Sequence, residues 1–467
     1  MPHLTLIQLS SLIFTIVAVI GLGVFSARSV KTAEGYSLNG RSAGAGLIAG
    51  GITGTIIGGS ATVGTAQLAT VFGLSAWWFT LGGGLGLLIM SAFYARPLRH
   101  SGLETIPQFL SKMYGPKAGP LASIISSLGV LFSCVACALS GIHMIAAMTG
   151  ASHVVAAAII VLLVVGYVVF GGLKGAGVSG LLKMSVLGAA LCVAGLGAVL
   201  ALYRMPDFSA SFPAYPWFSL WGRGGSVAAS NALSLIVGVL CTQTYVQAVY
   251  SAADARTAAI GTATAAAMVI PVGLPSIAIG MFMHVHHPDL APVLALPMYL
   301  VTYLPGWLGG VGLAALLLSV VGSIAGLSLG IGTMISNDIV RGVFGVRSDA
   351  RILLANRASV ATVACMAMAI ALSSLNSYVL DWSYMSMALR GGGIFLPLTL
   401  AIFRPGLLSG RWGVASMFVS TAAAVASWMF FPKLIPLFVG LVVSVGLVAV
   451  AVLLRGWSRR RLARRPA

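Results

Sequence analysis

Apolar windows of membrane length follow one another along almost the whole chain. Each window is roughly 20 residues long, which is the length that an α-helix needs to cross the hydrocarbon core of a bilayer. In that core the backbone must satisfy its own hydrogen bonds, and helices do so within one segment. We therefore predict an all-α polytopic membrane protein with about 13 transmembrane helices, in the windows 5–27, 45–69, 73–95, 119–149, 153–171, 181–203, 226–250, 258–283, 308–336, 353–374, 378–403, 412–431 and 434–454.

Composition excludes the soluble classes of protein. Hydrophobic residues make up 59% of the chain and charged residues 7%, whereas a soluble domain carries about 25% charged residues. The net charge of +18 therefore does not indicate a nucleic-acid partner. Cys134 and Cys137 have CxxC spacing, but they lie in an apolar helix without a βαβ context, so we interpret them as small packing residues.

The basic residues predict the orientation in the membrane. With the N-terminus outside, 22 of the 26 Lys and Arg residues lie on the inner side, including Lys174 and Lys183 in one inner loop. The first window has no basic residue before it, so it is interpreted as a retained span. We expect a bacterial cytoplasmic (inner) membrane protein whose basic tail, 455–467, lies in the cytoplasm against anionic lipid.

Residues 45–69 form an apolar segment that is poorly suited to a continuous helix. Gly46, Gly50, Gly54 and Gly58 recur every fourth residue and line one narrow face, where another helix can approach closely. Each glycine inside a helix costs about 1 kcal/mol relative to alanine. A helix that only packs closely and a helix that is broken at mid-membrane are both compatible with this pattern. We favour the broken helix, whose free carbonyls can coordinate a cation.

Four stretches, in order, resemble motifs of the sodium:solute symporter family, which has the LeuT-type fold. They are YSLNGRSAGAGLIAG (36–50), GLETIPQFLSKMYG (102–115), QTYVQAVYSAADARTA (243–258) and SVVGSIAGLSLGIGTMISNDIVR (319–341). The resemblance implies a single transmembrane domain over residues 1–467 with a five-plus-five inverted repeat. Its parts would be a leading helix and loop (1–44), a first repeat (45–203), an outer loop (204–225), a second repeat (226–403), and two trailing helices with the basic tail (404–467).

The resemblance also implies where ion and solute bind. A sodium ion would lie between first-helix carbonyls and eighth-helix positions, here Gly54, Ile57, Ser319, Gly322 and Ser323. The substrate would lie between the broken first and sixth core helices, near Gly58, Gly59, Ser60, Thr80, Gln243 and Arg390. Where the family usually has two adjacent hydroxyl residues, this chain has Gly322 and Ser323, so one ligand is missing. Water, Ser319 or Thr55 could replace it; otherwise sodium binds weakly or a proton is the coupling ion.

Arg390 lies in the middle of the window 378–403 and is followed by three glycines. A guanidinium at that depth costs at least about 2.5–3.5 kcal/mol on insertion scales. Asp381 is nine residues away, about 13 Å along a helix, so we assign it to an outer gate rather than to Arg390. Arginine binds carboxylates with two parallel hydrogen bonds, which favours an anionic substrate over a purely structural role.

These observations predict a cation-coupled symporter, with Na⁺ as the coupling ion, that moves a small carboxylate solute by alternating access. The alternatives are a proton-coupled or Na⁺-independent transporter of a neutral solute or amino acid, and a membrane sensor on the same scaffold. No pore-lining ring favours a channel, and no HExxH motif or paired acid favours an enzyme. We expect no cofactor beyond the coupling ion. His284, His286 and His287 could bind a metal, but we interpret them as part of a solvated loop.

Overall fold

The computed structural model describes residues 4–27, 38–431 and 434–463, and in that part of the chain every named element is helical. A helix occupies each of the predicted windows, so the all-α polytopic fold class is confirmed. The windows 153–171 and 181–203, which we predicted as two spans, lie in one continuous helix, His153–Tyr203. Within these described ranges, 10 helices are able to cross a membrane by length and composition, and shorter apolar helices accompany them. The count of 13 spans and the division into two repeats stay predictions.

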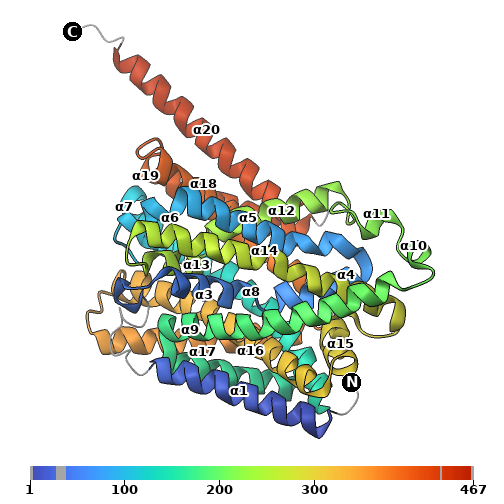
Figure 1. Cartoon of the computed structure of the whole chain (residues 1–467). Helices are drawn as coiled ribbons and strands as arrows, with labels where there is room; N and C mark the ends of the chain where they lie inside the picture. The colour runs from blue at the N-terminus through green and yellow to red at the C-terminus, as the bar shows by residue number, and fades with distance from the viewer. Residues whose placement is uncertain (1–3, 28–37, 432–433, 464–467) are drawn as a thin grey trace.

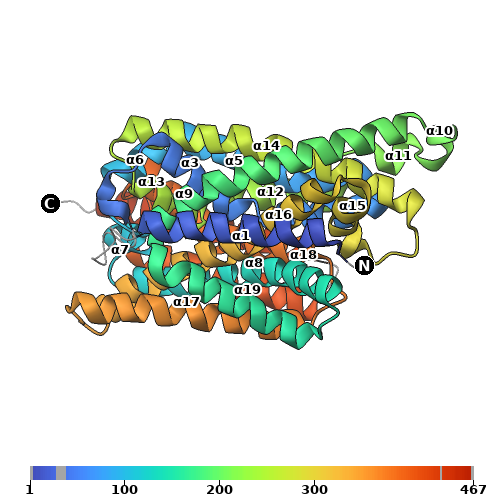
Figure 2. The same ribbon diagram turned by 60° about the horizontal axis from the view of Figure 1, so that its bottom comes forward.

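The helices lie side by side and form one bundle (Figures 1 and 2). At the end of the bundle near the N-terminus lie the short helices α10, α11 and α15, and the C-terminus lies at the opposite end. The last helix, α20, projects away from the others in Figure 1. The main helices are α1 (Leu6–Ala27), α3 (Ala45–Ile56), α4 (Thr65–Phe72), α5 (Trp78–Ile89), α6 (Ala95–His100), α7 (Ile106–Tyr114), α8 (Ala118–Thr149), α9 (His153–Tyr203), α10 (Phe208–Ser211), α11 (Ala214–Trp217), α12 (Gly225–Leu240), α13 (Gln243–Tyr250), α14 (Ala255–His286), α15 (Ala295–Tyr303), α16 (Gly306–Met334), α17 (Asp349–Leu372), α18 (Val379–Phe403), α19 (Gly410–Phe430) and α20 (Pro436–Ala463).

Two of the spans are broken near their middle. Helix α3 ends at Ile56, residues 57–59 are not helical, and the chain resumes as a π-helix, η2 (Ser60–Gly64), that leads into α4. Helix α12 ends at Leu240, and α13 begins at Gln243. The broken first helix that the glycine pattern predicted is therefore confirmed. A break in the sixth core helix, which the family resemblance implied, is also present.

The glycine face of α3 packs against α9. A methyl group placed on Gly180 would lie 2.2 Å from the backbone oxygen of Gly50 and 3.2 Å from Cα of Gly54. Only a residue without a side chain allows two helix backbones to come this close. The prediction that another helix approaches the glycine face is thus confirmed at Gly50 and Gly54. Gly46 lies in open space.

The position of Lys183 corrects one sequence-based expectation. The pattern of basic residues places Lys183 in an inner loop, but it lies inside α9 and its side chain is 1% exposed. The hydropathy pattern misled because a lysine at the edge of an apolar window is most often a loop residue. The side chain of Lys174, assigned to the same loop, lies outside the described residues.

Three of the family-like motifs meet at the end of the bundle where α6, α7 and α13 gather (Figure 2). We call Glu104, Thr105, Gln243, Asn337 and Asp338 the motif cluster. Thr105 Oγ1 donates to Asp338 Oδ1 (2.9 Å), and Asn337 Nδ2 donates to Glu104 Oε2 (2.7 Å). Gln243 accepts from the backbone N–H of Ile106 and donates to the carbonyl of Glu104. These bonds join three segments that are far apart in sequence.

Candidate substrate and cation site

The break after α3 is enclosed by three other helices. Ser60, the first residue after the break, shares a hydrogen bond of 2.7 Å with Ser383 of α18. A methyl group on Gly58 would lie 2.3 Å from Oγ of Ser323 in α16, and one on Gly59 would lie 2.6 Å from Cβ of Ser140 in α8. The glycines therefore let α16 and α8 contact the unwound backbone directly.

The residues predicted to bind sodium come together at this break. Ser319 Oγ donates a short hydrogen bond to the carbonyl of Ile57, and Ser323 Oγ donates to the carbonyl of Gly54 at 3.4 Å. Gly322 contributes no side-chain oxygen. The geometry thus assembles four of the five predicted positions around one point, while sodium binding there stays a prediction.

Lys183 reaches the same point from α9. Its Nζ donates to the carbonyl of Gly54 in a short hydrogen bond and to the carbonyl of Ser319 at 3.3 Å. No Asp or Glu among the described residues forms an ion pair with it. The amino group is therefore held by backbone carbonyl oxygens, in surroundings of the kind that hold an alkali cation.

Arg390 is fully buried beside the break between α12 and α13. Its Nη1 donates to Oγ1 of Thr242 (2.8 Å), and its Nη2 donates to Oγ of Ser386 (2.9 Å) and of Ser133 (3.2 Å). Its Nε donates to the carbonyl of Ser386, and Nη2 also contacts the sulfur of Met387 at 3.1 Å. A cation placed where α12 ends is favoured by the negative end of that helix dipole.

The predicted substrate residues do not all come together. Arg390 contacts the break in the sixth core helix, whereas Gly58, Gly59 and Ser60 form the break in the first. The link between them is α18, in which Ser383 lies seven residues before Arg390, about 10 Å along a helix. The two remaining predicted residues lie elsewhere: Thr80 faces Gly273 of α14, and Gln243 belongs to the motif cluster. The substrate role of all six stays a prediction.

At the end of the bundle near the N-terminus, the charged and histidine side chains have separate partners. Arg223 Nη1 and Asp381 Oδ1 form an ion pair of 3.0 Å, which links the 204–225 loop to the start of α18.

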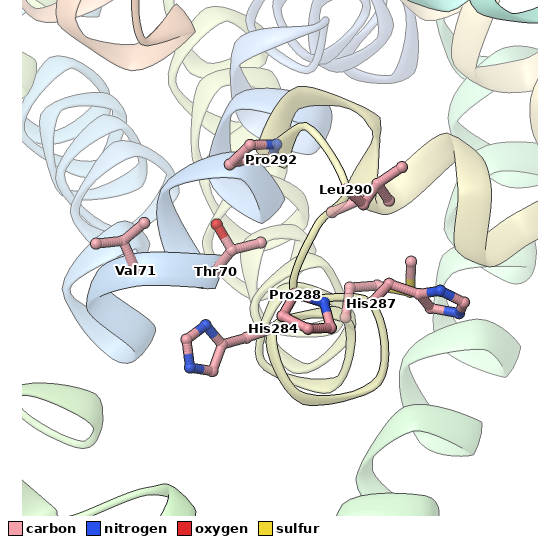
Figure 3. Close-up of a pocket in the computed structure, with 9 residues that line it drawn as sticks. Thr70, Val71, His284, His287, Pro288, Leu290 and Pro292 are labelled. Carbon is pink, nitrogen blue, oxygen red and sulfur yellow. The ribbon is translucent and has the colours of Figure 1, made fainter.

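The three histidines at this end also have partners or neighbours of their own. His286 stacks on Phe282, and His287 hydrogen-bonds Tyr303. His284 and His287 lie on opposite sides of the end of α14, beside a cavity of about 140 Å³ (Figure 3). Among the described residues, no three His, Cys, Asp or Glu side chains are grouped to hold a metal.

Sequence reasoning missed Lys183, Thr242, Ser133, Ser386 and Ser383. The sequence did indicate that Lys183 could lie within a span, because the apolar window 181–203 begins two residues before it. The hydroxyl residues gave no such signal, since serine and threonine are common in membrane helices and hydropathy does not indicate which face they occupy.

Comparison with known proteins gives the same fold. The chain superimposes on a Na⁺-coupled sialic acid symporter with a TM-score of 0.81 at 17% identity, covering 96% of this chain and 97% of that one. It superimposes on Mhp1, a nucleobase-cation-symport-1 family transporter, with a TM-score of 0.59 at 14% identity, covering 93% and 97%. At these identities the likeness concerns the fold.

Two curated relatives share part of the sequence. The high-affinity choline transporter 1 of Torpedo marmorata is 27% identical over 54% of this chain, and its Homo sapiens counterpart is 25% identical over 50%. The matched region spans 44% and 42% of the length of these relatives. The model of the sodium:solute symporter family matches residues 36–407, most of the chain. These residues include the two broken helices and the motif cluster, and the chain belongs to the sodium:solute symporter family.

Proposed function

We propose that this protein is a secondary transporter that moves a small carboxylate solute across the membrane by alternating access. The observation that carries the proposal is the pair of broken helices, both of which are bonded to α18. Ser60, after the first break, bonds to Ser383 of α18, and Thr242, in the second break, accepts a hydrogen bond from Arg390 of α18. Breaks of this kind expose backbone groups at mid-membrane, where transporters of related architecture hold their solute and coupling ion. Family membership supports Na⁺ as a coupling ion.

Arg390 favours an anionic solute. Its hydrogen-bond partners are hydroxyls, a carbonyl and a thioether, and no carboxylate among the described residues neutralises its charge. A guanidinium has five N–H donors, two of them on Nη1. Within the described part of the chain, Nη1 donates only to Thr242, so one N–H remains for an oxygen of the solute. A carboxylate would supply both that acceptor and the missing negative charge.

A cationic solute is the competing possibility, because the curated relatives are choline transporters. A quaternary ammonium placed near Arg390 would be repelled by the buried guanidinium, since low-dielectric surroundings strengthen like-charge repulsion. The sialic acid symporter, whose fold the chain shares, transports an acid. The charge at Arg390 therefore favours the carboxylate over choline.

Competition for binding tests the proposal most directly. Purified protein would first be scanned for stabilising solutes, because a ligand that binds only the folded state raises Tm. Uptake of the best carboxylate into proteoliposomes would then be measured against its neutral amide and against choline. We expect the carboxylate to compete and the amide and choline to fail. Equal competition by the amide would make a neutral solute the better conclusion, and preferential competition by choline would overturn the assignment of charge.

A further inference from the structure

The side chain of Lys183 lies where the bound sodium ion is expected. Its Nζ contacts the carbonyl oxygens of Gly54 and Ser319. Gly54 is one of the carbonyl ligands predicted from sequence, and Ser319 is one of the predicted eighth-helix ligands. The amino group therefore uses oxygens from both helices between which the cation would be coordinated.

The packing of α9 directs Lys183 to this position. Gly180 lies three residues before Lys183, so the two residues share one face of the helix. The close approach of Gly180 to Gly50 and Gly54 holds that face of α9 against α3. A lysine one turn further along is long enough to extend to the break, and its side chain is 1% exposed.

The remaining oxygens of the site already have donors. The carbonyl of Ile57 accepts from Ser319 Oγ, and that of Gly54 accepts from Ser323 Oγ as well as from Lys183. Gly322 brings no side-chain oxygen. Sodium would have to displace the amino group and turn both hydroxyls, so the residues present do not fit a sodium ion while Lys183 remains in place.

Buried lysines are rare unless a partner compensates them. Asp338 and Glu104, the buried and half-buried acids of the motif cluster, bond to Thr105 and Asn337 instead. Among the described residues, the Lys183 amino group is thus held by two carbonyl oxygens and no carboxylate, as a bound alkali ion can be. We propose that the Lys183 ammonium is the resident cation of this site, that it replaces sodium there, and that it ties α9 to the break in α3 and to α16.

This inference deepens the proposed transport function, since it concerns the coupling ion, but its central test needs no transport. The Tm of purified protein would be measured in NaCl and in KCl at equal ionic strength. We expect no Na⁺-specific shift from this site in the wild type. Lys183→Ala should have a lower Tm in KCl and should acquire a saturable, Na⁺-specific rise of a few degrees, because the emptied space exposes the carbonyl oxygens to a mobile cation.

Two further variants make the result specific. Lys183→Ala combined with Ser323→Ala should lose most of the acquired Na⁺ response, because it removes a hydroxyl ligand. Lys112→Ala, at an exposed position in α7 away from the break, should behave as the wild type does. An Na⁺ response in Lys183→Ala that Ser323→Ala leaves unchanged would contradict the proposal.

If Lys183→Ala fails to fold, the wild type and the single variant Ser323→Ala still provide a test. Ser323→Ala should leave any Na⁺ response of the wild type unchanged. A saturable Na⁺ stabilisation of the wild type whose half-saturating concentration rises several-fold in Ser323→Ala would show that sodium binds here beside the lysine, and it would overturn the inference.

Solute uptake separates this inference from the proposed function. Absence of uptake for every solute, in either salt, would contradict the transport function and leave the Tm comparison intact. Uptake that depends on Na⁺ and is unaffected by Ser323→Ala would place sodium coupling at other oxygens, and it would support Lys183 as the occupant of this site.

Discussion

Arg390 holds three helices together through neutral acceptors. It bonds to Thr242 after α12, to Ser133 of α8 and to Ser386 of its own helix. If Arg390 also binds the solute, as we propose, a substitution should have two effects, one on packing and one on solute binding. These effects can be separated, because the packing effect does not depend on the charge of the solute, whereas the solute effect does.

Arg390→Gln should abolish most uptake of the carboxylate, at a cost of order 2–5 kcal/mol, the scale for breaking a buried charge-assisted pair. Arg390→Lys should also transport poorly, because lysine keeps the charge but loses the planar fork. The measurement is kcat/KM for the carboxylate and for its amide, with Arg404→Gln as the control at an exposed position after the same helix. Equal losses for both solutes would assign Arg390 a structural role.

The helix elements were predictable to a large extent, and the reason is physical. The hydrocarbon core fixes span length, so the apolar windows predicted α8, α14 and α18 to within a few residues. The break after Ile56 was predictable because glycines and hydroxyls accumulate there. The rotation of each helix was not predictable, since it depends on packing against neighbours. For that reason Lys183 was misplaced, and the partners of Arg390 were not identified.

The contact between α3 and α9 predicts a contrast between two glycines of one helix. Gly180→Ala places a methyl group 2.2 Å from the oxygen of Gly50, whereas Gly188→Ala meets nothing within 4 Å. Overpacking costs about 1–3 kcal/mol, and alanine is favoured over glycine in a helix by about 1 kcal/mol. Thermal unfolding in detergent should show Gly180→Ala destabilised and Gly188→Ala unchanged or more stable. Similar losses in both would mean that the close approach is not rigid.

At the scale of the whole molecule, the motif cluster joins three segments at the end of the bundle where the C-terminus lies. Positive-inside counting predicts that this end faces the cytoplasm. The bonds from Thr105 to Asp338 and from Asn337 to Glu104 would have to break for the proposed substrate site to open in that direction. We therefore interpret the cluster as a seal on the inner side.

Asn337→Asp should weaken that seal, because it places a carboxylate against Glu104. Cys137 is buried beside Gly58, so it reports on opening of the break. With the exposed Cys192 and Cys365 replaced by serine, Cys137 should be alkylated several-fold faster in Asn337→Asp than in the parent. Buried Cys134 is the internal control, and equal acceleration at both cysteines would indicate unfolding rather than opening.

Topology can be tested on the intact chain. Reporter fusions after residue 455 should be cytoplasmic and fusions at the N-terminus should be external, because nearly all basic residues fall on one side. A reporter found outside the cell after residue 455 would reverse the assignment and make the motif cluster an outer seal. A reporter placed in the loop that contains Arg223 is the matched control, and we expect it to be external.

The covalent attachment of the Lys183 ammonium group to the chain has an energetic consequence for the cell. An ion that dissociates on the other side of the membrane carries free energy with it, and a charge covalently fixed to the chain carries none. While Lys183 occupies it, the site between Gly54 and Ser319 would couple no sodium gradient to the transport of the solute. A carrier relying on this site alone would then let a charged solute flow only down its own electrochemical gradient, which is set by the two solute concentrations and by the membrane potential.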